Sequence, residues 1–196
     1  MAPLVAALRD LVRWLRASRA KGAIIGGVAA SLLGRPRFTR DVDALVLLED
    51  NAWAPFLSAG AAFGLVPRRP DALAFARRTR VLLLRHEPSG IDVDVSLGTL
   101  PFEEEAVARA RSRRVIAGVS VPLVSPEDLI VMKAIAHRPR DIADIESLVD
   151  ARPALDRTRI RRWVREFAAI LHAPELVTDL ERVLNARKTA GSKRRR

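Results

Sequence analysis

Two pairs of aspartates carry most of the chemistry that this sequence offers. Asp41 and Asp43 stand one residue apart at the start of one apolar run, and Asp92 and Asp94 repeat that spacing in a second run. Because side chains alternate along a strand, the members of each pair face the same side, about 6–7 Å apart. If the two runs are neighbouring strands, three or four carboxylates converge. Such a cluster stays ionised only around a cation, and oxygen ligands without Cys or His favour Mg²⁺ or Mn²⁺ over zinc.

A glycine pair precedes the first aspartates. Gly26 and Gly27 end an apolar, strand-like run, and a short helix-like run follows them. A glycine loop that opens a helix offers backbone N–H groups to phosphate. Such a loop beside a carboxylate-held divalent cation is typical of phosphoryl or nucleotidyl transfer. In that chemistry one metal ion orients the triphosphate and a second activates the attacking hydroxyl.

The competing interpretation gives the acids a structural role. Asp41 and Asp92 would cap turns or pair with nearby arginines such as Arg37 and Arg40, which would also balance an acidic cluster. For either strand alone this interpretation is competitive. Charged residues at alternate positions of an otherwise apolar strand occur twice here, however, so we regard it as the minor one.

The elements that must position these residues form an α/β half followed by a helical half. Helical spacing of apolar residues predicts a packed amphipathic helix near the N-terminus, and strands and helices then alternate. A Glu-Pro-Ser-Gly turn predicts a hairpin whose second strand carries Asp92 and Asp94. From Ser125 the pattern is helical, beginning with a capping serine and a first-turn proline. We expect a mixed-sheet α/β domain (residues 1–124), an α-helical bundle (125–186) and a disordered basic tail (187–196).

The composition of the chain narrows the kinds of partner that it is expected to bind. The 196 residues carry a formal net charge of +11, and the basic tail contributes a large part of it. A basic chain suits an acidic partner such as RNA, although solvated surface arginines explain the charge equally well. Aromatic residues make up 5% of the chain and tyrosine is absent, which argues against a base-stacking platform. The absence of cysteine excludes disulfides, and three scattered histidines make a structural zinc site unexpected.

Membrane association is not expected. No apolar run is long enough to span a bilayer, and the N-terminal segment lacks the core of a signal peptide. We therefore expect no membrane partner and a cytoplasmic location.

The chain resembles a known superfamily in the order of its motifs. The signature of polymerase-beta-like nucleotidyltransferases is similar to Gly26-Gly27, a gap of thirteen residues, Asp41-Val42-Asp43 and a later Asp in an apolar run. The segments GGVAASLLGRPRFTRDVD and VSPEDLIVMKAIAHRPRDIADIESL resemble the AbiEii-like toxin nucleotidyltransferases and their uncharacterised relatives. The resemblance covers about residues 20–150. It implies a nucleotidyltransferase core, a divalent metal ion and a nucleoside triphosphate (NTP) as substrate.

The resemblance also implies roles for individual residues of the α/β half. Gly26 and Gly27 would form the phosphate loop, with Ser31 just beyond as a further phosphate donor. Asp41 and Asp43 would be the metal-binding pair.

The third carboxylate follows from a downstream motif. In relatives it precedes a Pro-aromatic-Glu stretch, so the segment Pro101-Phe102-Glu103 selects Asp94 as base or metal ligand. Asp92 on the same face is the alternative. Thr39 and Arg40, beside the metal pair, are secondary candidates.

Two residues of the helical half match the same resemblance. Lys133 would reach the triphosphate, and Asp141 would be the acid of the family's Lys/Arg-Asp motif. On residue type alone, Lys133 is an ordinary exposed helix lysine and Asp141 is a stabilising acid at a helix N-terminus.

The leading hypothesis is a magnesium-dependent nucleotidyltransferase that moves a nucleoside monophosphate (NMP) from an NTP to an acceptor hydroxyl and releases pyrophosphate. The toxin resemblance implies an RNA or protein acceptor and a cognate antitoxin. One alternative is a catalytically inactive nucleotide- or RNA-binding module. Another is a structural partner whose basic tail docks on nucleic acid.

Overall fold

The chain divides into two compact units. A computed structural model describes residues 2–116 and 118–192. The first unit contains the residues up to Ala29 together with Arg37–Ser125, and the second contains Ala30–Pro36 together with the residues from Pro126 onward. The second unit thus takes in residues 30–36, which the sequence assigns to the α/β domain.

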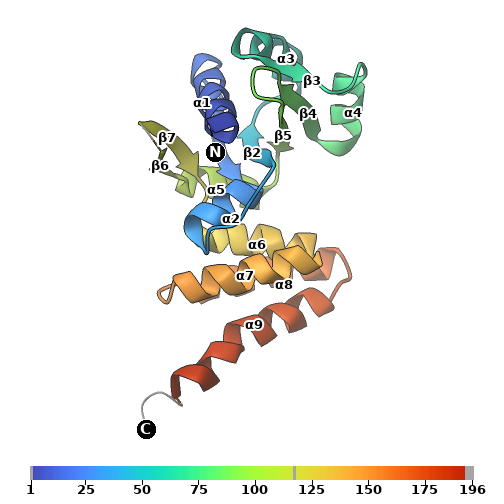
Figure 1. Cartoon of the computed structure of the whole chain (residues 1–196). Helices are drawn as coiled ribbons and strands as arrows, with labels where there is room; N and C mark the ends of the chain where they lie inside the picture. The colour runs from blue at the N-terminus through green and yellow to red at the C-terminus, as the bar shows by residue number, and fades with distance from the viewer. Residues whose placement is uncertain (1, 117, 193–196) are drawn as a thin grey trace. The chain divides into compact units, whose positions relative to one another are not determined.

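A mixed sheet forms the centre of the first unit. In the described part of the chain it has seven strands in the order β3-β4-β5-β2-β1-β7-β6 (Figure 1). Strand β2 pairs in parallel with β5, and β1 pairs in parallel with β7, while the other neighbours are antiparallel. The strands are β1 (Lys21–Ile25), β2 (Asp41–Leu47), β3 (Leu65–Pro67), β4 (Val81–His86), β5 (Ile91–Gly98), β6 (Arg111–Ile116) and β7 (Val119–Leu123).

The α/β fold class predicted from the sequence is confirmed, as is the hairpin of β4 and β5. Two strands were not predicted. Strand β3 has only three residues, and β6 begins with Arg-Ser-Arg-Arg, a composition that hides strand character. Strand β6 ends the sheet, where charged side chains protect the unpaired edge from further strand pairing.

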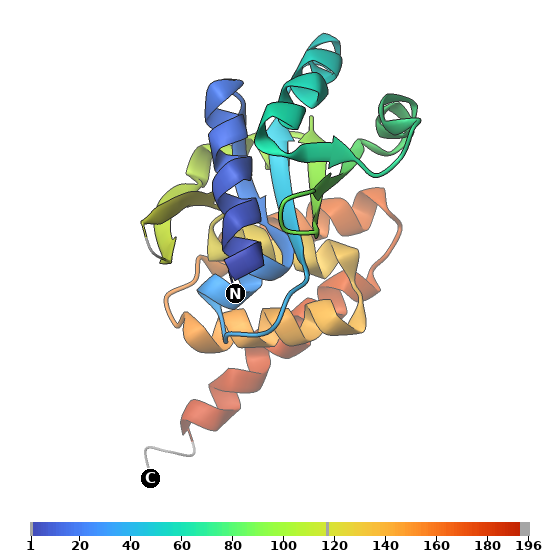
Figure 2. The same ribbon diagram turned by 45° about the horizontal axis from the view of Figure 1, so that its top comes forward.

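Helices flank the sheet of the first unit. Helix α1 packs against β2, β5 and β7 (Figure 2). It buries Leu8, Leu11 and Leu15 of the apolar face that its helical spacing predicted, and it also buries Trp14. Helix α1 spans Ala2–Ala17, and the other helical segments of this unit are η1 (Asp50–Ala52), α3 (Trp53–Gly60), η2 (Ala61–Phe63), α4 (Ala72–Thr79) and α5 (Pro101–Arg109). Helix α2 (Gly26–Leu33) begins in the first unit and ends in the second.

The second unit is helical. Asp156 caps the N-terminus of α8, because its side chain accepts a hydrogen bond of 2.9 Å from the Arg159 N–H. Residues 30–36 bind to α7, since the backbone N–H of Arg35 donates to Ser147 Oγ at 2.6 Å and its guanidinium pairs with Asp150 at 2.6 Å. The helices are α6 (Pro126–Ala136), α7 (Pro139–Ala151), α8 (Arg157–Ile170) and α9 (Glu175–Ser192).

Helix α9 differs from the predicted tail. It continues to Ser192, whereas the sequence predicts disorder from residue 187. Arg187, Lys188 and Ala190 in this extension are good helix formers. The rest of the predicted tail, residues 193–196, lies outside the described residues. None of the described helices is long and apolar enough to cross a membrane.

Trp14 provides a direct test of the α1 packing. Its ring is fully buried and stacks on Phe56 at 3.9 Å between centroids, and its Nε1 donates to the Phe56 carbonyl at 3.1 Å. Trp14→Ala should therefore lower the free energy of unfolding by about 3–5 kcal/mol in urea denaturation. Arg16→Ala, at an exposed position of the same helix, should change it by less than about 0.5 kcal/mol. Similar losses in both variants would contradict this packing.

Candidate active site

The four aspartates lie together on one face of the sheet. In the parallel pairing of β2 and β5, Asp41 is in register with Asp92, and Asp43 is in register with Asp94. Neighbouring strands lie about 4.8 Å apart, so the carboxylates form two facing pairs. The alternate residues, such as Val42 and Val93, are fully buried on the other face. The two acidic runs are neighbouring strands, which is the condition under which the sequence predicts a carboxylate cluster.

Two arginines donate to the carboxylates of Asp92 and Asp94 on β5. Arg68 follows β3, and its guanidinium donates to Asp92 Oδ2 at 2.9 Å and also to Asp94 Oδ1. Arg85 lies opposite Asp92 in the antiparallel pairing of β4 and β5 and donates to Asp92 Oδ1 from two nitrogens, at 2.8 and 2.9 Å. Both oxygens of Asp92 are therefore engaged by cations, and Asp94 shares one of these cations.

Sequence reasoning missed both arginines. Arg85 could have been found, because hairpin register places it across from Asp92. Arg68 lies in a segment, Val-Pro-Arg-Arg-Pro-Asp, that the sequence presents as a loop, and its backbone N–H bonds to Leu83 through a long-range pairing. The secondary candidate Arg40 instead lies over the Phe38 ring, 5.7 Å from its centroid.

The surroundings of Asp94 raise its pKa. Burial raises its pKa, Arg68 partly offsets the rise, and the charges of Asp43, Asp41 and Asp92 raise the pKa further. The result is an acid that holds its proton more readily than an ordinary aspartate. Its charged form is stabilised by any cation that approaches.

The glycine loop packs directly on Asp43. Gly26 has a φ of +63°, and a Cβ at this position would lie 1.8 Å from Asp43 Oδ2, so a side chain is excluded. The Gly27 N–H donates to the same oxygen at 3.3 Å, and a Cβ on Gly27 would meet Thr39 Oγ1 at 2.5 Å. Thr39 in turn donates to Asp41 Oδ1 at 2.8 Å. The structure thus brings Gly26, Gly27 and Thr39 close to the first aspartate pair.

The remaining sequence candidates belong to the second unit. Ser31 lies on α2 in the part assigned to that unit. Lys133 is buried, at 5% exposure, and its Nζ donates to Asp141 at 2.8 Å and pairs with Asp144 at 2.9 Å. Burial raises the pKa of Asp141, but hydrogen bonds from Arg138 and Lys133 outweigh it, and the net pKa is lowered. Lys133 is therefore a charge-compensated, buried residue of α6 rather than the exposed lysine that its residue type suggests.

The acid cluster offers the donor atoms that a divalent cation prefers, but the side chains are not arranged around a common point. Its donors are carboxylate oxygens on fixed neighbouring strands, the ligand type that Mg²⁺ and Mn²⁺ prefer. Within residues 2–116 and 118–192, no group of three or more His, Cys, Asp or Glu side chains is arranged to hold a metal ion. Arg68 occupies one oxygen of Asp94 and one of Asp92, so a bound cation would compete with this guanidinium.

A family comparison decides what kind of protein carries this cluster. A family model described as "Nucleotidyltransferase of unknown function (DUF6036)" matches residues 7–161. The chain belongs to the DUF6036 nucleotidyltransferase family. This match supports the nucleotidyltransferase superfamily expected from the motifs, whereas the AbiEii-like subtype is not shown by it. No curated protein matches the chain by sequence.

Solved structures agree with the fold of this DUF6036 chain. An antigenic nucleotidyltransferase-like protein from Paracoccidioides brasiliensis is 18% identical, with a TM-score of 0.53 over 89% of this chain and 90% of its own. The antibiotic-resistance factor ANT(2'')-Ia in solution is 18% identical, with a TM-score of 0.58 over 89% of this chain and 97% of its own. A crystal structure of ANT(2'')-Ia in complex with adenylyl-2''-tobramycin gives 17% identity and a TM-score of 0.55, covering 87% and 99%.

Two glycines with positive φ test the contact between the loop and Asp43. Gly90 has a φ of +69°, and a Cβ there would meet open space. Gly90→Ala should therefore lower the unfolding free energy by about 1–2 kcal/mol from backbone strain alone. Gly26→Ala should cost at least about 1 kcal/mol more, because its methyl group must displace Asp43. Equal losses in urea denaturation would contradict the close packing of the loop on this carboxylate.

Lys133 tests the buried network of the DUF6036 helical unit. Lys133→Met should lower the unfolding free energy by about 3–5 kcal/mol, because Asp144 and Asp141 lose a buried cation. Arg140→Met, at an exposed position on α7, is the matched control and should change it by less than about 0.5 kcal/mol.

The network should also respond to pH. Since the folded-state pKa of Asp141 is lowered, its contribution to stability is present above about pH 4, the unfolded value, and is lost as the pH falls through the folded value. The stability difference between the wild type and Lys133→Met should therefore shrink in acid. A difference that stays constant from pH 7 into the acid range would contradict the ionised pair.

Proposed function

We propose that this protein transfers an NMP from an NTP to an acceptor hydroxyl in a reaction that requires Mg²⁺ or Mn²⁺. The acceptor oxygen forms a bond to the α-phosphorus, the bond from that phosphorus to the bridging oxygen breaks, and pyrophosphate leaves. The hydroxyl proton passes to a carboxylate. The observation that carries the proposal is the register of β2 and β5, which faces Asp41 and Asp43 toward Asp92 and Asp94 beside a glycine loop.

Asp41, Asp43 and Asp94 are the proposed metal ligands. A bound divalent cation would supply positive charge to the triphosphate and to the leaving pyrophosphate. The protein's own contribution is to fix the carboxylates: Thr39 orients Asp41, the Gly27 N–H orients Asp43, and strand register fixes Asp94.

Asp94 is preferred over Asp92 as the third carboxylate. Both oxygens of Asp92 are engaged by Arg68 and Arg85, whereas Asp94 faces Asp43, the residue on which the glycine loop packs. Its raised pKa is consistent with a group that receives the proton of the acceptor hydroxyl. Asp92 then has a structural role, as the acid that holds the two arginines on the sheet.

The glycine loop is the proposed phosphate site. Gly26 and Gly27 begin α2, so the backbone N–H groups of its first turn have no partner within the helix, and the Gly27 N–H donates to Asp43. The absence of a side chain at Gly26 lets the backbone lie against Asp43, and the same openness would let phosphate oxygens approach.

Different observations support different classes of acceptor. The AbiEii-like resemblance supports an RNA or protein acceptor, and with it a toxin controlled by a cognate antitoxin. The solved structure of ANT(2'')-Ia with adenylyl-2''-tobramycin supports a small antibiotic acceptor in a protein of similar fold. The strongly basic composition favours an acidic acceptor over a cationic antibiotic.

The test is a labelling experiment with three carboxylate variants. The protein is incubated with Mg²⁺ and each α-labelled NTP, together with total RNA, a protein lysate, an aminoglycoside or no acceptor. Asp43→Asn and Asp94→Asn should each reduce label transfer by about 100-fold or more, equivalent to about 2.7 kcal/mol of barrier. Asp92→Asn should reduce it by less than about tenfold.

The labelled acceptor identifies its class. Equal loss in Asp92→Asn and Asp94→Asn would contradict the assignment of the third carboxylate. Absence of label with every acceptor, together with unchanged nucleotide affinity in Asp43→Asn, would contradict transfer and favour the inactive binding module.

A further inference from the structure

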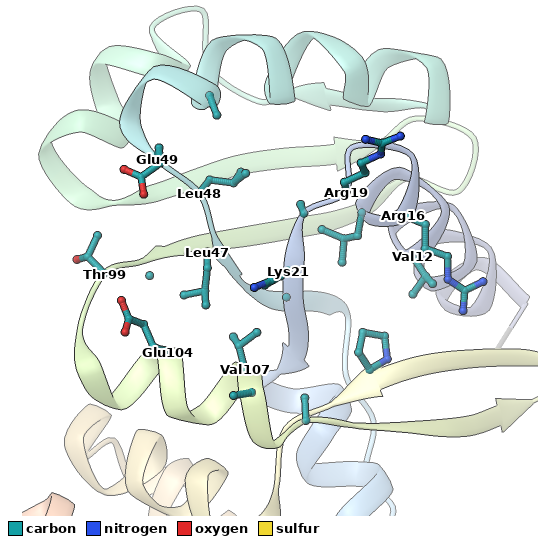
Figure 3. A pocket seen from close by; sticks show the side chains of 18 of the residues that line it. Val12, Arg16, Arg19, Lys21, Leu47, Leu48, Glu49, Thr99, Glu104 and Val107 are labelled. Atoms are coloured by element: carbon teal, nitrogen blue, oxygen red, sulfur yellow. The ribbon is translucent and has the colours of Figure 1, made fainter.

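A large cavity lies at the other end of the strands that carry the acids. Its volume is about 1260 Å³, and residues of the first unit line it, among them Leu47 at the end of β2 and Gly98 at the end of β5 (Figure 3). Asp41 begins β2, six residues before Leu47, and a strand rises about 3.3 Å per residue. The cavity is thus about 20 Å from the carboxylates, and the proposed reaction does not use it.

Charges of opposite sign lie at opposite sides of this cavity. Arg16, near the end of α1, and Arg19, in the turn after it, lie on one side, and Glu49 and Glu104 lie on the other (Figure 3). The side chain of Lys21, at the start of β1, extends between them. Between them the lining is mostly apolar, with aliphatic side chains from β2, α1 and α5.

Five charged side chains at this cavity have no partner within the described part of the protein. Among the described residues, no ion pair or side-chain hydrogen bond engages Arg16, Arg19, Lys21, Glu49 or Glu104. Asp50 differs, since it pairs with Arg80 at 3.6 Å. All five of the unpaired residues are exposed at the rim. A ligand whose own charges are separated, with an apolar part between them, would complement both rims at once.

The size and lining favour a polypeptide over other ligands. The volume exceeds the range of about 300–1,000 Å³ that is typical of small-molecule pockets. No aromatic side chain is found among the described lining residues, so a nucleobase has no stacking surface. Glu49 and Glu104 would repel the phosphates of a nucleic acid strand that extends across the cavity.

We propose that this cavity binds a peptide segment of a partner protein. The segment carries acidic residues that pair with Arg16, Arg19 and Lys21, apolar residues that contact the aliphatic lining, and a basic residue that pairs with Glu49 or Glu104. Because β2 and β5 run continuously from the cavity to the carboxylates, a partner bound here is attached to the same rigid strands as the proposed active site.

Selection from a phage-displayed library of random peptides, with the folded protein as target, tests the proposal. The selected peptides should carry acidic and basic residues at opposite ends of an apolar segment. Their affinity for Lys21→Glu and for Glu104→Lys should each fall at least about tenfold, measured by fluorescence anisotropy with synthetic copies. Arg77→Glu and Glu87→Lys make the same charge changes at exposed positions outside the cavity and should bind like the wild type.

The variants change exposed residues, and unchanged circular dichroism and NTP affinity would confirm that each one is folded. Selected peptides that lack this charge polarity, or that bind Lys21→Glu and Glu104→Lys as well as the wild type, would overturn the proposal. So would a selection that yields no binder. A uridine oligonucleotide that binds the wild type and loses affinity in Lys21→Glu but not in Glu104→Lys would assign the basic rim to nucleic acid instead.

Discussion

The parallel pairing of β2 with β5 is the constraint on which the proposed site depends. Side chains alternate along both strands, so a slip of one residue would place each aspartate on the face that now holds Val42 and Val93. Burying a carboxylate there without a partner would cost several kcal/mol. The apolar face therefore fixes the register, and the register sets the acids opposite one another. The same contacts that stabilise the sheet determine the geometry of the cluster.

Repulsion among the four aspartates raises the free energy of the folded protein, and fixed hydrogen-bonding and cationic partners offset this rise. Arg68 and Arg85 pair with Asp92, the Gly27 N–H bonds to Asp43, and the Thr39 hydroxyl bonds to Asp41. Asp94 is left with a raised pKa. In this arrangement Arg68 takes the position of a counter-ion. A divalent cation at the proposed site would compete with Arg68 for Asp94.

The sequence predicts the parts of this site that depend on local pattern. Alternation identified Asp41 and Asp43, and the hairpin turn identified the strand of Asp92 and Asp94, because both signals lie within a few residues. Arg68 was missed because its position depends on pairing between β3 and β4, which is not visible in a three-residue strand. The burial of Lys133 was missed for a related reason: its partners, Asp141 and Asp144, come from the next helix, and helical periodicity alone does not reveal that packing.

Binding of Mn²⁺ together with a non-hydrolysable NTP, followed by electron paramagnetic resonance, tests the central claim most directly. The account predicts that the wild type immobilises Mn²⁺, that Asp43→Asn and Asp94→Asn weaken its binding at least about tenfold, or by about 1.4 kcal/mol, and that Asp92→Asn binds it nearly as the wild type does. Mn²⁺ affinity that is the same in the wild type, Asp43→Asn and Asp94→Asn would contradict the claim that the facing aspartates of β2 and β5 form a metal–nucleotide site.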